Sequence, residues 1–150
     1  MQSVHPAFDR IQQQRFAQHE RARGLTQAAQ HFDRMIRREL QQLGTALWGV
    51  DYALGILPIR RYRVRFQPGT EMCVWRVEHD IPPYEWYRCV AYQVQVALDD
   101  RDAPVITVHS RAATHGVTPL EPESLRIALV EAAQDAPLII SRDMGEASDR

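Results

Sequence analysis

Three arginines alternate with apolar or aromatic residues in the segment RYRVRFQ, residues 61–67. Successive side chains of a β-strand point to opposite faces, so a strand here would carry Arg61, Arg63 and Arg65 in a row on one face. Guanidinium groups bind carboxylates and phosphates through paired hydrogen bonds. The row is therefore the first candidate for a binding surface.

Two tryptophans and a fourth arginine form a second candidate site. The alternation of apolar residues predicts that Trp75, Trp86 and Arg88 belong to the apolar face of the sheet. A guanidinium in an apolar layer needs a polar partner, and Glu39, at the edge of a predicted helix, is the expected one. A structural salt bridge with packed aromatic rings is the simpler outcome. The alternative is a pocket between helix and sheet, in which Arg88 binds an anion.

The residue types that most often carry catalysis show no pattern typical of an enzyme. None of the six histidines forms the i, i+4 pair with an intervening acid that a helix-borne zinc site uses. His109 and His115 could meet across a loop, but no acidic residue is placed to orient either as a base. Two cysteines are too few for a disulfide framework or a thiolate zinc site, and no glycine-rich phosphate loop is present. We identify no catalytic residue, metal site or cofactor, which favours a non-enzymatic protein.

Arginine is the only strongly basic residue type in the chain, which has 18 Arg and no Lys. The chain also has no Asn. Both missing residues have A-rich codons, so the composition indicates a GC-rich, bacterial-like genome and weakens an arginine cluster as a sign of specific recognition. Residues 1–65 contain 11 Arg and five acidic residues, whereas residues 66–150 contain seven Arg and 14 acidic residues. Such asymmetry indicates an oppositely charged partner or neutralisation within one fold, and the net charge of −1 favours the latter.

A cytoplasmic protein with no membrane association is expected. The sequence has no run of about 18 apolar residues, and MQSVHPAFDR at its start lacks the apolar stretch of a secretory signal. Its length predicts a single α+β domain over residues 1–150, with residues 1–5 and 143–150 flexible.

Two N-terminal helices are predicted, over residues 6–23 and 27–48, with Gly24 ending the first and Thr26 capping the second. The glycine-rich segment GVDYALGILPI then reads as a loop. A four-stranded antiparallel meander is expected next, with Gln67 opposite Thr70 across a tight turn at Pro68 and Gly69. Its strands are placed near residues 60–67, 70–79, 84–98 and 104–110.

The remainder of the chain predicts one helix and one short strand. Thr118 and Glu121 form a capping box with Pro119 at the first helical position, and the helix runs to about Gln134. A short apolar strand follows, near residues 138–141. The helices are expected to cover one face of the sheet, against its apolar side chains.

The opposite face of the sheet is the predicted interaction surface. It combines arginine with aromatic and small apolar residues, a mixture typical of protein interfaces. We therefore expect a non-enzymatic module that binds a protein partner, or associates with itself into a homo-oligomer. The residues expected to bind are Arg61, Arg63, Arg65, Arg76, Tyr87 and His109.

Two alternatives remain at this stage. The same face could bind an anion or a single-stranded nucleic acid, although an isoelectric point near 6.6 is low for a nucleic-acid-binding domain. The second alternative is a small-ligand or catalytic pocket beneath the helix, near Trp75, Trp86 and Arg88.

Overall fold

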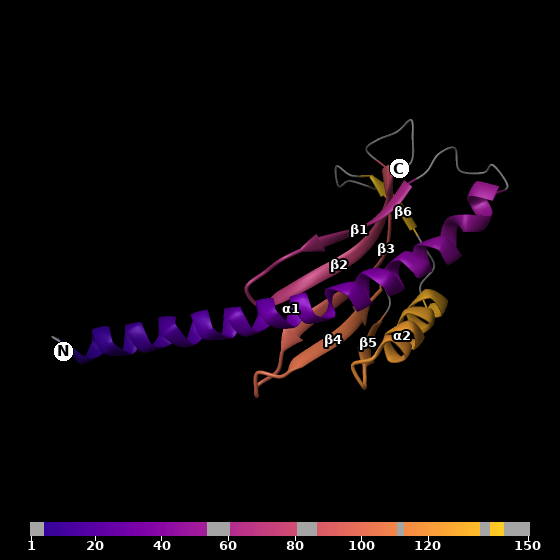
Figure 1. Ribbon diagram of the computed structural model, residues 1–150. Helices are drawn as coiled ribbons and strands as arrows, with labels where there is room; N and C mark the ends of the chain where they lie inside the picture. The colour runs from indigo at the N-terminus through magenta and orange to yellow at the C-terminus, as the bar shows by residue number, and fades with distance from the viewer. Residues whose placement is uncertain (1–4, 54–60, 81–86, 111–112, 136–138, 143–150) are drawn as a thin grey trace.

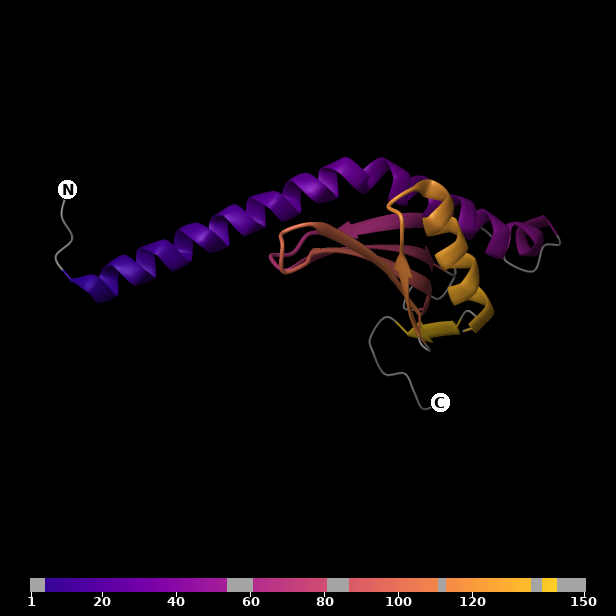
Figure 2. The same cartoon turned by 90° about the horizontal axis from the view of Figure 1, so that it is seen from below.

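The computed structural model describes residues 5–53, 61–80, 87–110, 113–135 and 139–142. It confirms the α+β class, with two helices lying on one face of an antiparallel sheet (Figures 1 and 2). The elements, in chain order, are α1 (Pro6–Ala53), β1 (Arg61–Gln67), β2 (Met72–Asp80), β3 (Tyr87–Leu98), β4 (Pro104–His109), β5 (Thr114–Val117), α2 (Pro122–Asp135) and β6 (Ile139–Arg142).

The sheet follows the predicted meander and extends it. Neighbouring strands pair antiparallel in the order β1-β2-β3-β4-β5, and β6 pairs with the first residues of β3. The strand β5 was not predicted, because its four residues include Gly116 and show too short an alternation. Pairing with β4 specifies it instead, with Thr114 opposite His109 and Val117 opposite Ile106.

The predicted register of the β1–β2 hairpin is wrong. Gln67 pairs with Val74 rather than with Thr70, so the connection is longer than a two-residue turn. The shift along β2 is an even number of residues, and side chains therefore keep the faces assigned to them. A Cβ atom at Gly69 would lie far inside van der Waals contact with the carbonyl oxygen of Met72. The chain thus folds back closely upon this glycine.

Instead of the two predicted helices, α1 is one helix of 48 residues. A single glycine within a helix costs only about 1 kcal/mol, and tertiary contacts on both sides of Gly24 offset that cost. On one side the Arg21 guanidinium donates to the carbonyl oxygens of Leu98 (2.8 Å) and Asp99 (3.3 Å) and pairs with the Asp102 carboxylate. On the other, Leu25 is buried in the core.

Both remaining boundary predictions for α1 are also wrong. Thr26 is not an N-cap, because its hydroxyl lies inside the helix and donates to the carbonyl oxygen of Ala22. The helix also continues through the first part of the expected loop and ends at Ala53. Residues 54–60 lie outside the described part of the chain, as do 1–4 and 143–150, to which most of the predicted flexible ends belong.

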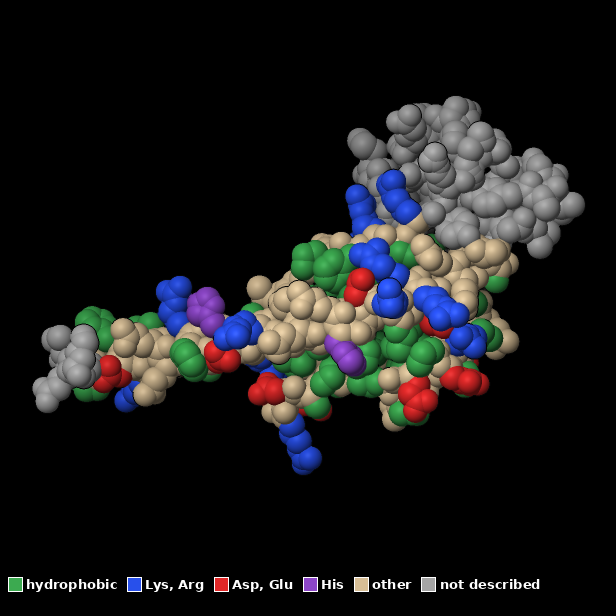
Figure 3. Space-filling model, in the orientation of Figure 1, with side chains coloured by type: hydrophobic (Ala, Val, Ile, Leu, Met, Phe, Trp, Pro, Cys, Tyr) green, Lys and Arg blue, Asp and Glu red, His purple; other side chains and the backbone are tan. Residues whose placement is uncertain are grey.

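The N-terminal part of α1 projects beyond the sheet as an arm, defined here as residues 6–20 (Figures 1 and 2). Its apolar side chains Phe8, Ile11 and Phe16 are 61%, 50% and 66% exposed. On the side of the arm visible in Figure 3, hydrophobic side chains are scattered among charged and polar ones. Within the described residues, neither helix combines the length and apolar character needed to cross a bilayer.

The core lies between the helices and the inner face of the sheet, as predicted. From α1, Ile36 and Leu40 are fully buried, as are Trp75 and Val94 from the sheet. The second helix contributes the predicted stripe of Leu125, Ala128, Leu129 and Ala132, all buried.

The start of α2 differs from the predicted capping box at Thr118. Helical hydrogen bonding begins with the Leu125 amide donating to the Glu121 carbonyl oxygen (3.1 Å), which places Pro122 rather than Pro119 at the first helical position. Proline is favoured there because that position needs no amide donor.

An ion pair between a buried carboxylate and an exposed guanidinium joins the two helices. The Glu39 side chain is only 2% exposed, and both of its carboxylate oxygens accept hydrogen bonds from Arg126, from Nε at 3.0 Å and Nη2 at 2.9 Å. Hydrogen bonding and charge from Glu39 raise the pKa of Arg126 above its ordinary value. Arg88 was the predicted partner of Glu39, and its side chain lies outside the described part of the structure. The contact with Arg126 shows that this carboxylate connects α1 with α2.

Replacing Gly69 by alanine should destabilise the hairpin, because the added Cβ meets the backbone of Met72. Overpacking of this kind costs about 1–3 kcal/mol, and the free energy of unfolding in urea measures it. Gly116→Ala is the matched control. A Cβ there meets no atom within 4 Å, so its effect should stay within about 0.5 kcal/mol. Equal losses at both glycines would contradict the described turn.

Replacing Arg126 by methionine should lower Tm, because it leaves the buried Glu39 carboxylate without its guanidinium. The double variant Glu39→Met/Arg126→Met removes the charge as well and should melt above the single Arg126→Met variant. Arg34→Met, at an exposed position of α1, controls for loss of a positive charge. Strictly additive losses at Glu39 and Arg126 would show that the pair is not coupled.

Candidate binding surfaces

A line of polar residues crosses five strands on the face of the sheet opposite the helices, here called the outer face. Their backbone register is continuous from Arg65 through Arg76, Gln93 and His109 to Thr114. The adjacent positions along these strands are core residues, among them Trp75, Val94 and Val108. Strand alternation therefore directs the line away from the helices.

The same face becomes more apolar with distance from this line. The neighbouring line contains Val74 and Gln95. The line beyond that one consists of Met72, Ala97 and Val105. Met72 and Val105 are 42% and 39% exposed. The outer face thus passes from arginine to exposed apolar surface within the width of a few residues.

The arginines supply the positive charge of the outer face. Arg63 and Arg65 are exposed, and the half-buried Arg76 donates from Nη2 to the Gln67 side-chain oxygen at 2.6 Å. His109 does not add to this charge near neutral pH, because burial lowers its pKa below 6.5. Its two ring nitrogens share hydrogen bonds with the hydroxyls of Thr107 (2.8 Å) and Thr114 (3.1 Å).

Of the six predicted binding residues, Arg63, Arg65, Arg76 and His109 come together on the outer face. Arg61 lies in register with Asp80 at the far end of β1. Tyr87 pairs with Arg142 of β6 and is six residues from Gln93 along β3, about 20 Å at the rise of a strand. The side chains of Arg61 and Tyr87 lie outside the described part of the structure.

A β-bulge changes the predicted alternation of β3. The register with β2 shifts between Arg76 and Glu78, so that Asp80 lies opposite Arg88. A continuous alternation placed Arg88 on the same face of β3 as the apolar positions from Tyr92 onward. Because of the bulge, the backbone position of Arg88 does not share that face. Bulges leave little mark on a sequence, and none was predicted here.

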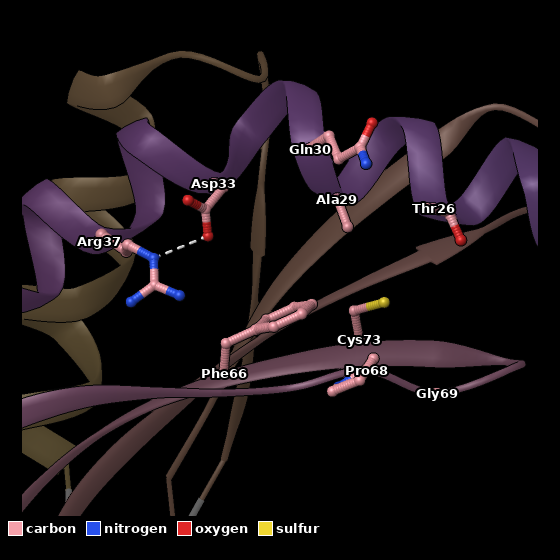
Figure 4. Close-up of a pocket in the computed structure, with 9 residues that line it drawn as sticks. All are labelled: Thr26, Ala29, Gln30, Asp33, Arg37, Phe66, Pro68, Gly69 and Cys73. Atoms are coloured by element: carbon pink, nitrogen blue, oxygen red, sulfur yellow. Dashed lines mark hydrogen bonds and ion pairs between the residues drawn. The ribbon is translucent and has the colours of Figure 1, made fainter.

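A pocket of about 400 Å³ lies between α1 and the β1–β2 hairpin (Figure 4). It occupies the expected layer between helix and sheet, but its lining differs from the predicted one. Trp75 is completely buried, the Arg88 side chain is not described, and Trp86 lies outside the described residues. The residues that line the pocket are Thr26, Ala29, Gln30, Asp33, Arg37, Phe66, Pro68, Gly69 and Cys73.

The polar end of the pocket is a network centred on Asp33. Its Oδ1 accepts a hydrogen bond from Arg37 Nε and another from the buried Trp75 indole nitrogen, each at 2.8 Å. Sequence reasoning missed this pair, although Asp33 and Arg37 have the i, i+4 spacing that brings side chains together on a helix. Their closeness to Phe66 and Cys73 depends on tertiary packing and could not be read from spacing.

Both places present side chains that can form hydrogen bonds, ion pairs and apolar contacts with a ligand. In the described parts of the chain, no three His, Cys, Asp or Glu side chains come close enough together to hold a metal ion. Cys73 carries a free, buried thiol. Comparison with protein-family models, with curated proteins and with solved structures finds no match to this chain.

The low pKa of His109 should make folding stability depend on pH. Between its folded pKa and the ordinary value of 6.5, the unfolded chain binds more protons than the folded one. The free energy of unfolding therefore falls as pH decreases through that window, and the full contribution is present above it. His109→Gln should lose this part of the pH dependence in urea titrations, whereas His19→Gln, on the exposed arm, should keep it. A ring titration by NMR at or above 6.5 would contradict the assignment.

Proposed function

We propose that this protein is a non-enzymatic interaction module that binds a protein partner through the outer face of its sheet. The observation that supports this most directly is that both described helices lie on the other face, while Arg63, Arg65, Met72 and Val105 are exposed (Figure 2). Arginine and methionine are enriched in the centres of protein interfaces. A suitable partner would present carboxylates next to an apolar patch.

The chain itself carries such a complementary surface on α2. Glu123, Ile127 and Val130 recur at helical spacing, and the two apolar side chains are 53% and 47% exposed. Glu131 is exposed beside them. Contact between this acidic, apolar helix face and the outer face of a second copy would bring opposite charges together, which favours association. Self-association is therefore the first partner relationship to test.

Such a contact joins two different surfaces, so it is heterologous and would lead to rings or to open chains of subunits. It would also give a role to the opposed charges of the two halves of the sequence. The opposite charges of the two halves can be neutralised within one fold, as the net charge favours. Charge pairing between copies is compatible with this.

Single-stranded nucleic acid is a weaker partner for this face. Stacking on aromatic rings contributes much of the affinity for unpaired bases. Among the described side chains of the outer face there is no Trp, Tyr or Phe. The arginines would provide backbone contacts only.

Charge reversal tests the proposal. Light scattering and sedimentation over a range of concentrations should show self-association that Arg65→Glu weakens at least about tenfold, because like charges would then face each other. Glu123→Arg should weaken it similarly, and the double variant Arg65→Glu/Glu123→Arg should recover much of the loss. Arg34→Glu makes the same charge change on the exposed side of α1 and should have no effect.

A monomer at all concentrations, with no partner retained by the wild type and lost by Arg65→Glu, would refute the interaction module. Binding of single-stranded DNA or RNA that declines steeply with salt and is lost in Arg65→Glu would support the nucleic-acid alternative instead.

A further inference from the structure

The pocket under α1 has an apolar body and one charged end (Figure 4). Phe66, Pro68 and Cys73 form its sheet side, and Ala29 faces them from the helix. Asp33 and Arg37 lie together at the other end. Small-molecule sites combine an apolar lining with few polar groups in this way, and about 400 Å³ falls within their usual range.

The Arg37 guanidinium is held so that its terminal nitrogens are directed into this space. Its Nε donates to Asp33 Oδ1, which fixes the plane of the group from one side. In Figure 4 the two terminal nitrogens point away from α1, toward the level of Phe66. No described residue forms a hydrogen bond with either of them. Two parallel N–H donors on one guanidinium match the two oxygens of a carboxylate.

One carboxylate oxygen of Asp33 is bound within the protein, although the side chain is 40% exposed. Its Oδ1 accepts from both Arg37 and the fully buried Trp75. Phe66 packs on the same indole, with ring centroids 4.7 Å apart, so the pocket wall and the charged network support each other. Arg37 is the single cationic side chain among the lining residues. With the paired Asp33 the site is already neutral, so a bound monocarboxylate leaves it with one negative charge and a phosphate dianion with two.

We propose that this pocket binds a small organic monocarboxylate with an apolar body. The carboxylate oxygens accept hydrogen bonds from the two terminal nitrogens of Arg37. The apolar body extends along Ala29 and Phe66 toward Cys73 and leaves water. Binding here is independent of the outer face, because the pocket lies on the helix side of the sheet.

Phenylbutyrate is the probe, with phenylbutyramide as its uncharged match. In ¹H–¹⁵N NMR spectra, the acid at up to millimolar concentration should shift the Arg37 Nε–H and Trp75 indole signals saturably. The amide should bind at least about tenfold more weakly, since it loses the charge-assisted pair of hydrogen bonds. Equal affinity for acid and amide, shifts confined to other regions, or no saturable shift with the acid would overturn the proposal.

Two kinds of variant distinguish the contribution of the Arg37–carboxylate contact from that of the pocket volume. Arg37→Gln should weaken binding of the acid at least about tenfold and leave the amide unchanged. Arg34→Gln, one turn before it on the exposed side of α1, should bind like the wild type. Thr26→Trp narrows the pocket from an exposed position without touching Arg37, and should weaken acid and amide alike. An unchanged far-UV spectrum and Tm show that each variant is folded. Full binding by folded Arg37→Gln would refute the role of the guanidinium.

Discussion

The structure depends on burying alternate side chains of one sheet beneath two helices, of which α1 is the longer. Trp75 and Val94 are fully buried under α1, and burial of side chains this size stabilises a fold by about 1.5–3 kcal/mol each. Because side chains of a strand alternate between faces, the residues between these core positions point away from the helices. The arginine-bearing outer face is therefore a geometric result of the core.

Polar contacts spaced along α1 determine where the helix lies on that core. Arg21 binds the carbonyl oxygens at the end of β3, Asp33 accepts from Trp75 of β2, and Glu39 accepts from Arg126 of α2. Each contact joins α1 to a different element, so the helix is held at several points along its length. The middle contact also creates the charged end of the pocket. The packing of the helix and the proposed ligand site thus share the Asp33 carboxylate.

The sequence predicted the faces of the sheet better than its registers. Residues with period-two alternation, such as Trp75 and Val94, were assigned correctly because parity survives a register error of an even number of residues. The bulge after Arg76 and the strand containing Gly116 were missed, since both are specified by neighbouring strands. Local propensity alone predicted that a helix ends at Gly24. The helix continues because the contacts of Arg21 and Leu25 outweigh that propensity. The pocket joins residues from α1 with the β1–β2 hairpin, a proximity that no local pattern encodes.

The arm of α1 has a consequence for the dynamics of the chain. Residues 6–20 extend about 22 Å at the rise of a helix, and the first hydrogen bond that joins the described part of α1 to the sheet is made by Arg21. An unsupported helix of this length is marginal in water. Its amide protons should therefore exchange through local unwinding that leaves the sheet intact, and protection should rise sharply after Arg21. We therefore expect Arg21 to be the boundary between two cooperative units of one continuous helix.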